Sequence, residues 1–408
     1  MAKKPNQPEP LPTALPASPS PEPTPPTSTP RRLVAAIDIG SSAVRLDIGE
    51  VREQGEVRLL ESLRHGVRLG RDVFTQGRIQ QDTLRRCITI LKNYARLLAE
   101  YGITRPDQIR AVATSFAREA ANRDMFVDRV STATGFFVRI LEESEETLLT
   151  YLAVRDILAA RGLFDTGNVA VMEVGGGQTI LLYIRQGKVT VAQSFHAGAL
   201  RTHELIAVSG SAGNRTKSLL RAYATELMDQ VQQVIPREKV SALVVLGAGA
   251  RFAAENAAAD IQGPDSRITL ASTAKLAQLA DELALLPIEK LVKTRHMSHQ
   301  DAAGMAPALV TMTQAARTFK LREVHIVRAT LRDGLLREMS MREHRSESFE
   351  EQVIYSALTM AARYGTDETH VRAVEATALA LFDELREEHQ LDAHARLLLR
   401  CAALLHDI

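Results

Sequence analysis

Two similar segments, far apart in the chain, constrain the fold more than any other feature. Residues 35–42 read AAIDIGSS and residues 170–179 read AVMEVGGGQT, so each is an apolar run, one carboxylate and a turn of small residues. A second apolar run follows each turn, at residues 44–51 and 180–184. Apolar runs bounded by glycine predict buried strands. Two such hairpins predict a duplicated α/β domain that clamps phosphate between its halves.

The carboxylates of the two hairpins are candidate metal ligands. Asp38 and Glu173 occupy equivalent places, each at the end of a predicted strand. Carboxylate and phosphate oxygens suit Mg²⁺. The alternative is that each carboxylate only caps its own turn, but the repetition favours a role at a cation or its water shell.

The small residues of the turns are candidate phosphate ligands. Glycine lets backbone N–H groups approach an oxyanion closely. A strand at residues 242–246 also ends in glycine and leads into a helix. A tight hairpin or close strand–helix packing explains the same glycines without a ligand. The candidates are Gly40, Ser41, Ser42, Gly175, Gly176, Gly177, Gln178, Thr179, Gly247 and Gly249.

A predicted strand at residues 109–113 runs directly into a helix. Thr114 or Ser115 can cap this helix, and a helix N-terminus attracts anions. Arg118 lies about one turn into the helix, where a guanidinium can bind phosphate with two hydrogen bonds. The alternative for Arg118 is an ordinary surface arginine paired with a glutamate.

Four glutamates gather at another strand-to-helix junction, between a predicted strand at 137–141 and a helix that runs to Ala160. Acidic residues in a first helical turn complement the helix dipole, and most of the four should do only that. One that faces the cleft could be the general base for an attacking water, but spacing alone does not say which. The four are Glu142, Glu143, Glu145 and Glu146.

Composition narrows the class of protein. The 50 basic and 49 acidic residues leave a formal net charge of +1, which argues against a general nucleic-acid-binding surface. The two cysteines, Cys87 and Cys401, have no metal-binding spacing and indicate a reducing cytoplasm. We find no apolar stretch that would span a membrane and no secretory signal.

The chain divides into four predicted parts: a disordered Pro-rich tail at 1–31, two similar α/β domains at 32–150 and 151–342, and a helical domain at 343–408. Helices are also predicted at 82–101 and 305–319. In the last part, His370, His406 and Asp407 form either a metal site or ordinary helix-surface residues; the second interpretation is favoured.

In order and roughly in spacing, these pieces resemble the exopolyphosphatase and guanosine pentaphosphate phosphohydrolase (Ppx/GppA) family. Residues 112–122 are similar to its A-T-S-A-x-R-x-A-x-N signature, the most specific match. Further matches are residues 36–42 to the first phosphate loop, 67–70 to an R-L-G stretch, 145–149 to E-E-A-x-L, 173–179 to the second phosphate loop, 247–250 to a later glycine loop and 331–334 to L-R-E-G.

The resemblance implies a duplicated actin-like fold with a helical HD-type domain that is cut short at His406 and Asp407. It also implies hydrolysis of the terminal phosphate of polyphosphate or guanosine pentaphosphate in a homodimer with Mg²⁺ (or Mn²⁺). The second glutamate of E-E-A-x-L is the family's catalytic base, which maps onto Glu146. With it, Asp38, Glu173 and Arg118 would form the catalytic group.

Several residues depart from the family pattern. Ser42 replaces asparagine, Glu173 replaces aspartate, Gln178 replaces serine and Ile180 replaces an acidic residue at the metal-bearing end of the cleft. These changes keep a second hypothesis open: a sensor that binds polyphosphate or guanosine tetraphosphate without turnover and signals through the helical tail. A third, an ATP-dependent kinase of the same fold, is disfavoured by the specific match at residues 112–122.

Overall fold

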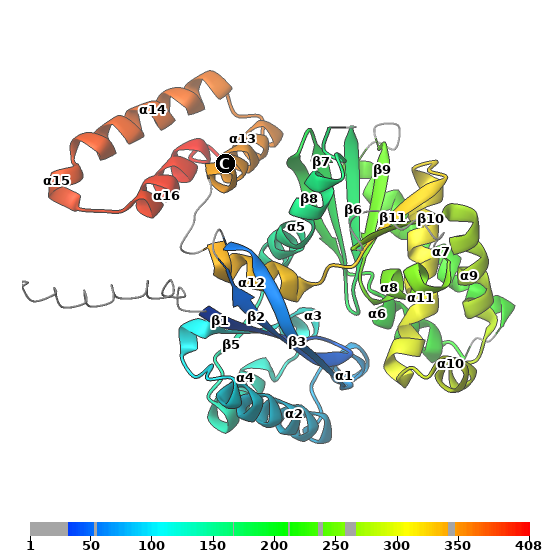
Figure 1. Cartoon of the computed structure of the whole chain (residues 1–408). Helices are drawn as coiled ribbons and strands as arrows, with labels where there is room; N and C mark the ends of the chain where they lie inside the picture. Colours follow the sequence, from blue (N-terminus) through cyan, green and yellow to red (C-terminus); the bar gives the residue numbers. More distant parts are fainter. Residues whose placement is uncertain are drawn as a thin grey trace, which may run out of the picture. The chain divides into compact units, whose positions relative to one another are not determined.

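A computed structural model of the chain describes residues 32–52, 55–165, 167–210, 213–235, 240–257, 267–341 and 347–408 (Figure 1). The predicted Pro-rich tail at 1–31 lies outside the described residues.

The first half is built on a mixed sheet with the strand order β3-β2-β1-β4-β5. Strands β1, β2 and β3 form an antiparallel meander, and β4 and β5 run parallel to β1. The strands are β1 (Arg32–Ile39), β2 (Ala43–Val51), β3 (Val57–Gly66), β4 (Ile109–Ala113) and β5 (Val138–Ile140).

The second half repeats this arrangement in a sheet of order β10-β11-β9-β6-β7-β8. Strands β6, β7 and β8 form the meander, β9 runs parallel to β6, and β11 runs parallel to β9. The repetition confirms the duplicated α/β architecture. The strands are β6 (Asn168–Val174), β7 (Thr179–Arg185), β8 (Lys188–Phe195), β9 (Ala242–Leu246), β10 (Ile268–Ser272) and β11 (Glu323–Val327).

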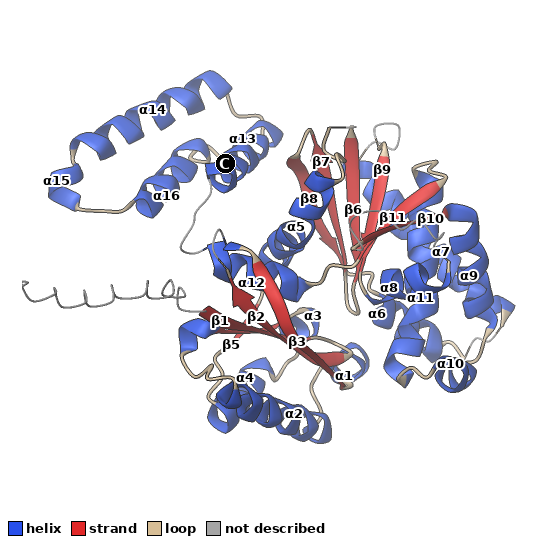
Figure 2. Ribbon diagram, viewed as in Figure 1, coloured by secondary structure: helices blue, strands red, loops and turns tan. Residues whose placement is uncertain are grey.

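Helices cover the first sheet on the side drawn below it in Figure 2. The helix predicted at 82–101 is α2, and its buried side chains recur every three or four residues, which fits a one-sided contact with the sheet. The helical segments are α1 (Leu69–Gln76), α2 (Gln81–Glu100), the 3₁₀ turn η2 (Pro106–Gln108), α3 (Ser115–Glu119) and α4 (Arg123–Thr134).

The second sheet has its own helical layer, at the centre of which lies α11. This helix was predicted to begin at Met305, but it begins at His299, because Ser298 caps it by accepting a hydrogen bond from the Asp301 backbone N–H (3.2 Å). The helices are α6 (Ala199–Val208), α7 (Asn214–Val234), α8 (Ala248–Asn256), α9 (Thr273–Leu285), α10 (Ile288–Arg295) and α11 (His299–Thr318).

Two further helices, α5 (Glu143–Ala160) and α12 (Leu331–Met341), share one apolar core with both sheets. This core includes Val34 and Ala36 of β1 and Val169 and Val171 of β6. Helix α12 follows β11 in sequence, yet it packs on α5 and on β1 of the first half. The chain therefore crosses between the halves twice.

The described residues from 347 onward are helical, as predicted. They form α13 (Glu347–Arg363), α14 (Glu368–Glu384), α15 (Arg386–His389) and α16 (Ala393–Leu404). Ile354, Ala357, Val371 and Leu404 make a small core of their own. In the described part of the chain, no helix has both the length and the apolar character needed to cross a bilayer.

The contact between α12 and α5 leaves no space for a side chain at Gly334. A Cβ atom there would lie 2.2 Å from the backbone oxygen of Leu149. We expect Gly334→Ala to lower the free energy of unfolding by roughly 1–3 kcal/mol, because either helix must shift. The control is Gly304→Ala. Gly304 also lies in a helix, but a Cβ atom there would make only ordinary contacts, the nearest at 3.6 Å, so this substitution should leave the free energy of unfolding unchanged or raise it. Denaturant unfolding of both variants checks this, and an unchanged Gly334→Ala protein would contradict it.

Candidate functional site

A polar cleft lies between the two hairpin turns. It brings together most of the residues singled out from the sequence: Asp38, Gly40, Ser41, Ser42, Thr114, Ser115, Glu146, Glu173, Gly175, Gly176, Gly177, Gln178, Gly247 and Gly249. Two of the candidates for phosphate binding or catalysis, Arg118 and Thr179, are not among the residues that line it. Arg118 lies behind the wall of the cleft. Thr179 is fully buried and donates its hydroxyl to the Ala197 carbonyl at 2.6 Å.

The glycines of the second turn allow the halves to approach closely. A Cβ atom on Gly177 would lie 2.3 Å from Ser115 Oγ, and one on Gly176 would lie 3.1 Å from Ser41 Cβ. The hydroxyls of Ser41 and Ser115 are themselves 3.5 Å apart. A larger side chain at Gly176 or Gly177 would force the two halves apart.

Helix α6 orients the peptide groups of the same turn. The carbonyl of Gly175 accepts a hydrogen bond from Ala199 N (2.8 Å), and that of Gly176 accepts from Leu200 N (2.9 Å). In a trans peptide, the carbonyl of one residue and the N–H of the next residue point in opposite directions. The N–H groups of Gly176 and Gly177 are therefore directed away from α6, as a phosphate cradle requires.

The helix after β4 differs from the sequence prediction. Thr114 occupies the N-cap position of α3, but its side chain makes no capping hydrogen bond, so the predicted cap by this residue is wrong. Thr114 and Ser115 are both buried in the wall of the cleft instead.

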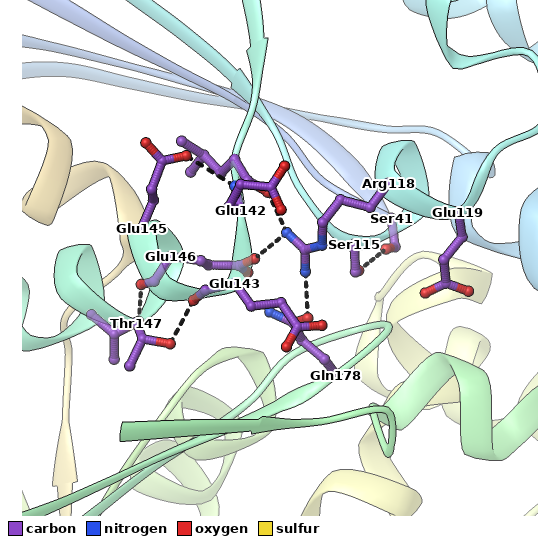
Figure 3. A network of polar contacts seen from close by, with 12 residues as sticks. Ser41, Ser115, Arg118, Glu119, Glu142, Glu143, Glu145, Glu146, Thr147 and Gln178 are labelled. Carbon is purple, nitrogen blue, oxygen red and sulfur yellow. Dashed lines mark hydrogen bonds and ion pairs between the residues drawn. The ribbon is translucent and has the colours of Figure 1, made fainter. Parts of the chain in front are cut away.

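The glutamates at the start of α5 separate into two roles (Figure 3). Glu145 accepts a hydrogen bond from the Glu142 backbone N–H (2.9 Å) and pairs with Arg139, so it stabilises the first turn of the helix. Glu146 lines the cleft instead, with its side chain 13% exposed.

Arg118 holds Glu146 from behind. Its Nη1 donates to Glu146 Oε2 (3.0 Å) and to the Leu141 carbonyl (2.6 Å), while Nη2 donates to Gln178 Oε1 (Figure 3). Both members of the ion pair are largely buried. Arg118 is thus paired with a glutamate, but this glutamate is the candidate base.

Burial decides the protonation of Glu146. Loss of solvation raises the pKa of this carboxyl to about 7, and the nearby charges of Glu173 and Asp38 act in the same direction. The Arg118 guanidinium opposes the shift but does not cancel it. A carboxylate that binds its proton this strongly is suited to act as a base near neutral pH.

Asp38 and Glu173 end equivalent strands but have different neighbours. In the register of β1 and β2, Asp38 lies opposite Arg45, and the two side chains pair at 3.2 Å. In β6 and β7, Glu173 lies opposite Ile180, whose side chain points to the same face and is buried. Burial raises the pKa of Glu173, which accepts a hydrogen bond from Thr150 Oγ1 at 2.8 Å.

Sequence reasoning assigned no role to the cations that line the cleft, Arg45, Arg251 and Arg332. Arg332 lies 3.7 Å from Asp38 and 2.7 Å from Asp47. Burial, with Arg45 and Arg332 nearby, lowers the pKa of Arg251. No local pattern marked Arg45 or Arg251, and Arg332 was noted only as part of the match at residues 331–334, without a role. Only their convergence from β2, α8 and α12 distinguishes them from surface residues.

Comparisons with known proteins agree with this geometry. Residues 48–343 match the model of the Ppx/GppA phosphatase family. The chain belongs to this family.

Among curated Ppx/GppA relatives, the guanosine-5'-triphosphate,3'-diphosphate pyrophosphatase of Photobacterium profundum is 26% identical over 386 residues, which are 92% of this chain and 72% of the relative. The crystal structure of the Aquifex aeolicus Ppx/GppA family member is 25% identical, with a TM-score of 0.61 over 78% of this chain and all of that one. An exopolyphosphatase from Cytophaga hutchinsonii, 17% identical, has a TM-score of 0.66 over 76% and 97% of the two chains. These similarities show that this chain has the actin-like fold of the Ppx/GppA proteins.

The glycines after β9 and the residues of the helical tail complete the set of candidates. Gly247 has a φ of +107°, and a Cβ on Gly249 would lie 2.5 Å from Ala308 Cβ, so helix packing accounts for the latter. In the helical tail, His370, His406 and Asp407 do come together: the two Nε2 atoms are 3.2 Å apart. All three residues are exposed, which is common for such groups without a metal.

The protonation of Glu146 is testable in the metal-free protein. We expect the Glu146 carboxyl to titrate near pH 7, well above its ordinary value of 4.5, so that it is largely protonated at pH 5.5 and ionised at pH 8.5. The variant Arg118→Met should raise this pKa further, because it removes the cation that favours the ionised carboxylate. Carboxyl ¹³C NMR, with the signal assigned by its loss in Glu146→Gln, measures both. A titration midpoint near 4.5 would contradict the prediction.

Proposed function

We propose that this protein hydrolyses the terminal phosphoanhydride bond of guanosine pentaphosphate, of inorganic polyphosphate, or of both. The observation that carries the proposal is a buried glutamate with a raised pKa beside two small-residue turns that line the same cleft. The name of the Photobacterium relative supports the nucleotide substrate. The fold similarity does not choose between the two substrates.

In this proposal, the terminal phosphate binds between the turns. The N–H groups of Gly176 and Gly177 donate to its oxygens from the second half, and the hydroxyls of Ser41 and Ser115 contact it from the first. Arg45, Arg251 and Arg332 balance the charge of the phosphates, as positioned cations do in other phosphoryl-transfer enzymes. Arg118 keeps its contact with Glu146 and does not bind the substrate.

Asp38 and Glu173 are the residues that would hold Mg²⁺ (or Mn²⁺). Their chemistry fits, because both offer carboxylate oxygens at the cleft and each charge raises the pKa of a neighbouring carboxyl, as like charges do. A bound divalent cation would screen this repulsion and offset charge on the phosphate oxygens. Asp38 would share its oxygens with Arg45 and Arg332.

Glu146 is the proposed general base. Its carboxylate accepts a proton from the water that attacks the terminal phosphorus in line with the leaving oxygen. The Arg118 guanidinium fixes the carboxylate from behind and leaves its other face toward the cleft. Since the base is poised near pH 7, phosphate release should rise with pH through that value.

One observation favours the alternative of a binding protein with little turnover. Ile180 replaces the family's acidic residue directly opposite Glu173, so the second half supplies one carboxylate fewer at the cation-bearing end. Strong guanosine tetraphosphate or polyphosphate binding without release of phosphate would support this alternative.

The central test compares two neighbouring glutamates. Glu146→Gln should reduce the rate of phosphate release by about 10²–10⁴-fold with either substrate, because the base is lost while the side chain keeps its size and shape. Glu145→Gln is the matched control: its side chain acts at the outer face of the same helical turn, and its activity should stay near that of the wild type. Steady-state assays of phosphate release with guanosine pentaphosphate and with polyphosphate measure both. Equal phosphate release by Glu146→Gln and the wild type would refute Glu146 as the base, and no release by either protein would refute the hydrolase.

The role of the carboxylates predicts how activity depends on the cation. We expect chelation of divalent cations to abolish phosphate release and added Mg²⁺ to restore it. Asp38→Asn and Glu173→Gln should each raise the Mg²⁺ concentration needed for half-maximal activity by roughly tenfold or more, since each removes a charged ligand. Magnesium titrations at fixed substrate measure this, and unchanged midpoints in both variants would show that the cation binds elsewhere.

A further inference from the structure

Gln178 forms a polar contact between the halves at the candidate base. It lies in the turn between β6 and β7 of the second half, whereas Arg118 belongs to α3 and Glu146 to α5 (Figure 3). The side chain of Gln178 is 3% exposed and its amide oxygen accepts a hydrogen bond from Arg118 Nη2. The same guanidinium holds Glu146 through Nη1.

The other end of this amide has no partner. Gln178 Nε2 is buried and makes no hydrogen bond to any described residue, although Gln178 lines the cleft. A rotated amide would not resolve this, because Nε2 would then face Arg118, which can only donate. Since buried N–H groups are rarely left without an acceptor, the geometry indicates that the acceptor arrives with the ligand.

We propose that Gln178 is a positioning residue that keeps Arg118 oriented toward Glu146 and donates from Nε2 to an oxygen of the terminal phosphate. The proposal rests on the hydrolase function described above and adds a residue to it. The phosphate cradle and the base belong to opposite halves. Through Gln178, the turn that binds the phosphate also fixes the arginine that holds the base.

A serine, which the family resemblance leads one to expect here, cannot do this. Its hydroxyl is one bond from Cβ, whereas the amide of Gln178 is two carbons further out and spans the gap to Arg118. This substitution therefore replaces a local contact of the turn with a contact across the cleft.

Two near-isosteric variants separate the roles of the amide. Gln178→Met removes both the acceptor for Arg118 and the donor for phosphate, and we expect kcat to fall by about ten- to a hundredfold. Gln178→Glu keeps an acceptor for Arg118 but replaces the donor with a charged oxygen that repels phosphate, so KM should rise as well. Wild-type kcat and KM in both variants would overturn the proposal. Impairment of Gln178→Met alone would overturn the phosphate contact.

A double-mutant cycle tests whether Gln178 acts through Arg118. If it does, Gln178→Met should lower kcat by a smaller factor in an Arg118→Met background than in the wild type, because the shared contact is already lost. An equal fold-decrease of kcat in both backgrounds would overturn the positioning role. Gln178→Ser, with a small side chain that fits any turn, provides the same comparison if Gln178→Met folds poorly. Glu146-dependent activity of the wild type is measured alongside, so that failure of the hydrolase function is recognised separately.

Discussion

The site depends on the absence of side chains where the two halves meet. At Gly177 a Cβ atom would lie 2.3 Å from Ser115 Oγ of the first half, and at Gly176 one would lie 3.1 Å from Ser41 Cβ. This close approach encloses the cleft, buries Glu146 and Glu173, and brings Gln178 within reach of Arg118. The electrostatics of the site thus follow from a steric condition in the turns.

The duplicated hairpins have diverged at one cross-strand position. Arg45 and Ile180 lie opposite Asp38 and Glu173, respectively, in the same register of each hairpin. In the first half the carboxylate is therefore neutralised by a neighbour, whereas in the second it stands beside an aliphatic side chain that adds to its desolvation. Two geometrically similar carboxylates consequently have different electrostatic environments, which suits them to unequal parts in binding a cation.

The sequence predicted the duplicated architecture and most of the cleft, because both rest on local patterns. The apolar runs defined β1, β2, β6 and β7 closely, and the shared turn chemistry correctly indicated that the turns would face one another. It could not predict which glutamate of α5 faces inward without the family resemblance, because that depends on how the helix lies between the sheets. It also missed the network around Arg118, which joins residues from three elements.

The second half is, in topological terms, an insertion within the first. The chain enters the second half through α5 and leaves it through α12, and these two helices pack side by side. The two connections between the halves therefore lie next to each other, on one side of the second half. Because Gln178 belongs to the second half and Arg118 to the first, any separation of the halves would also break the hydrogen bond between them.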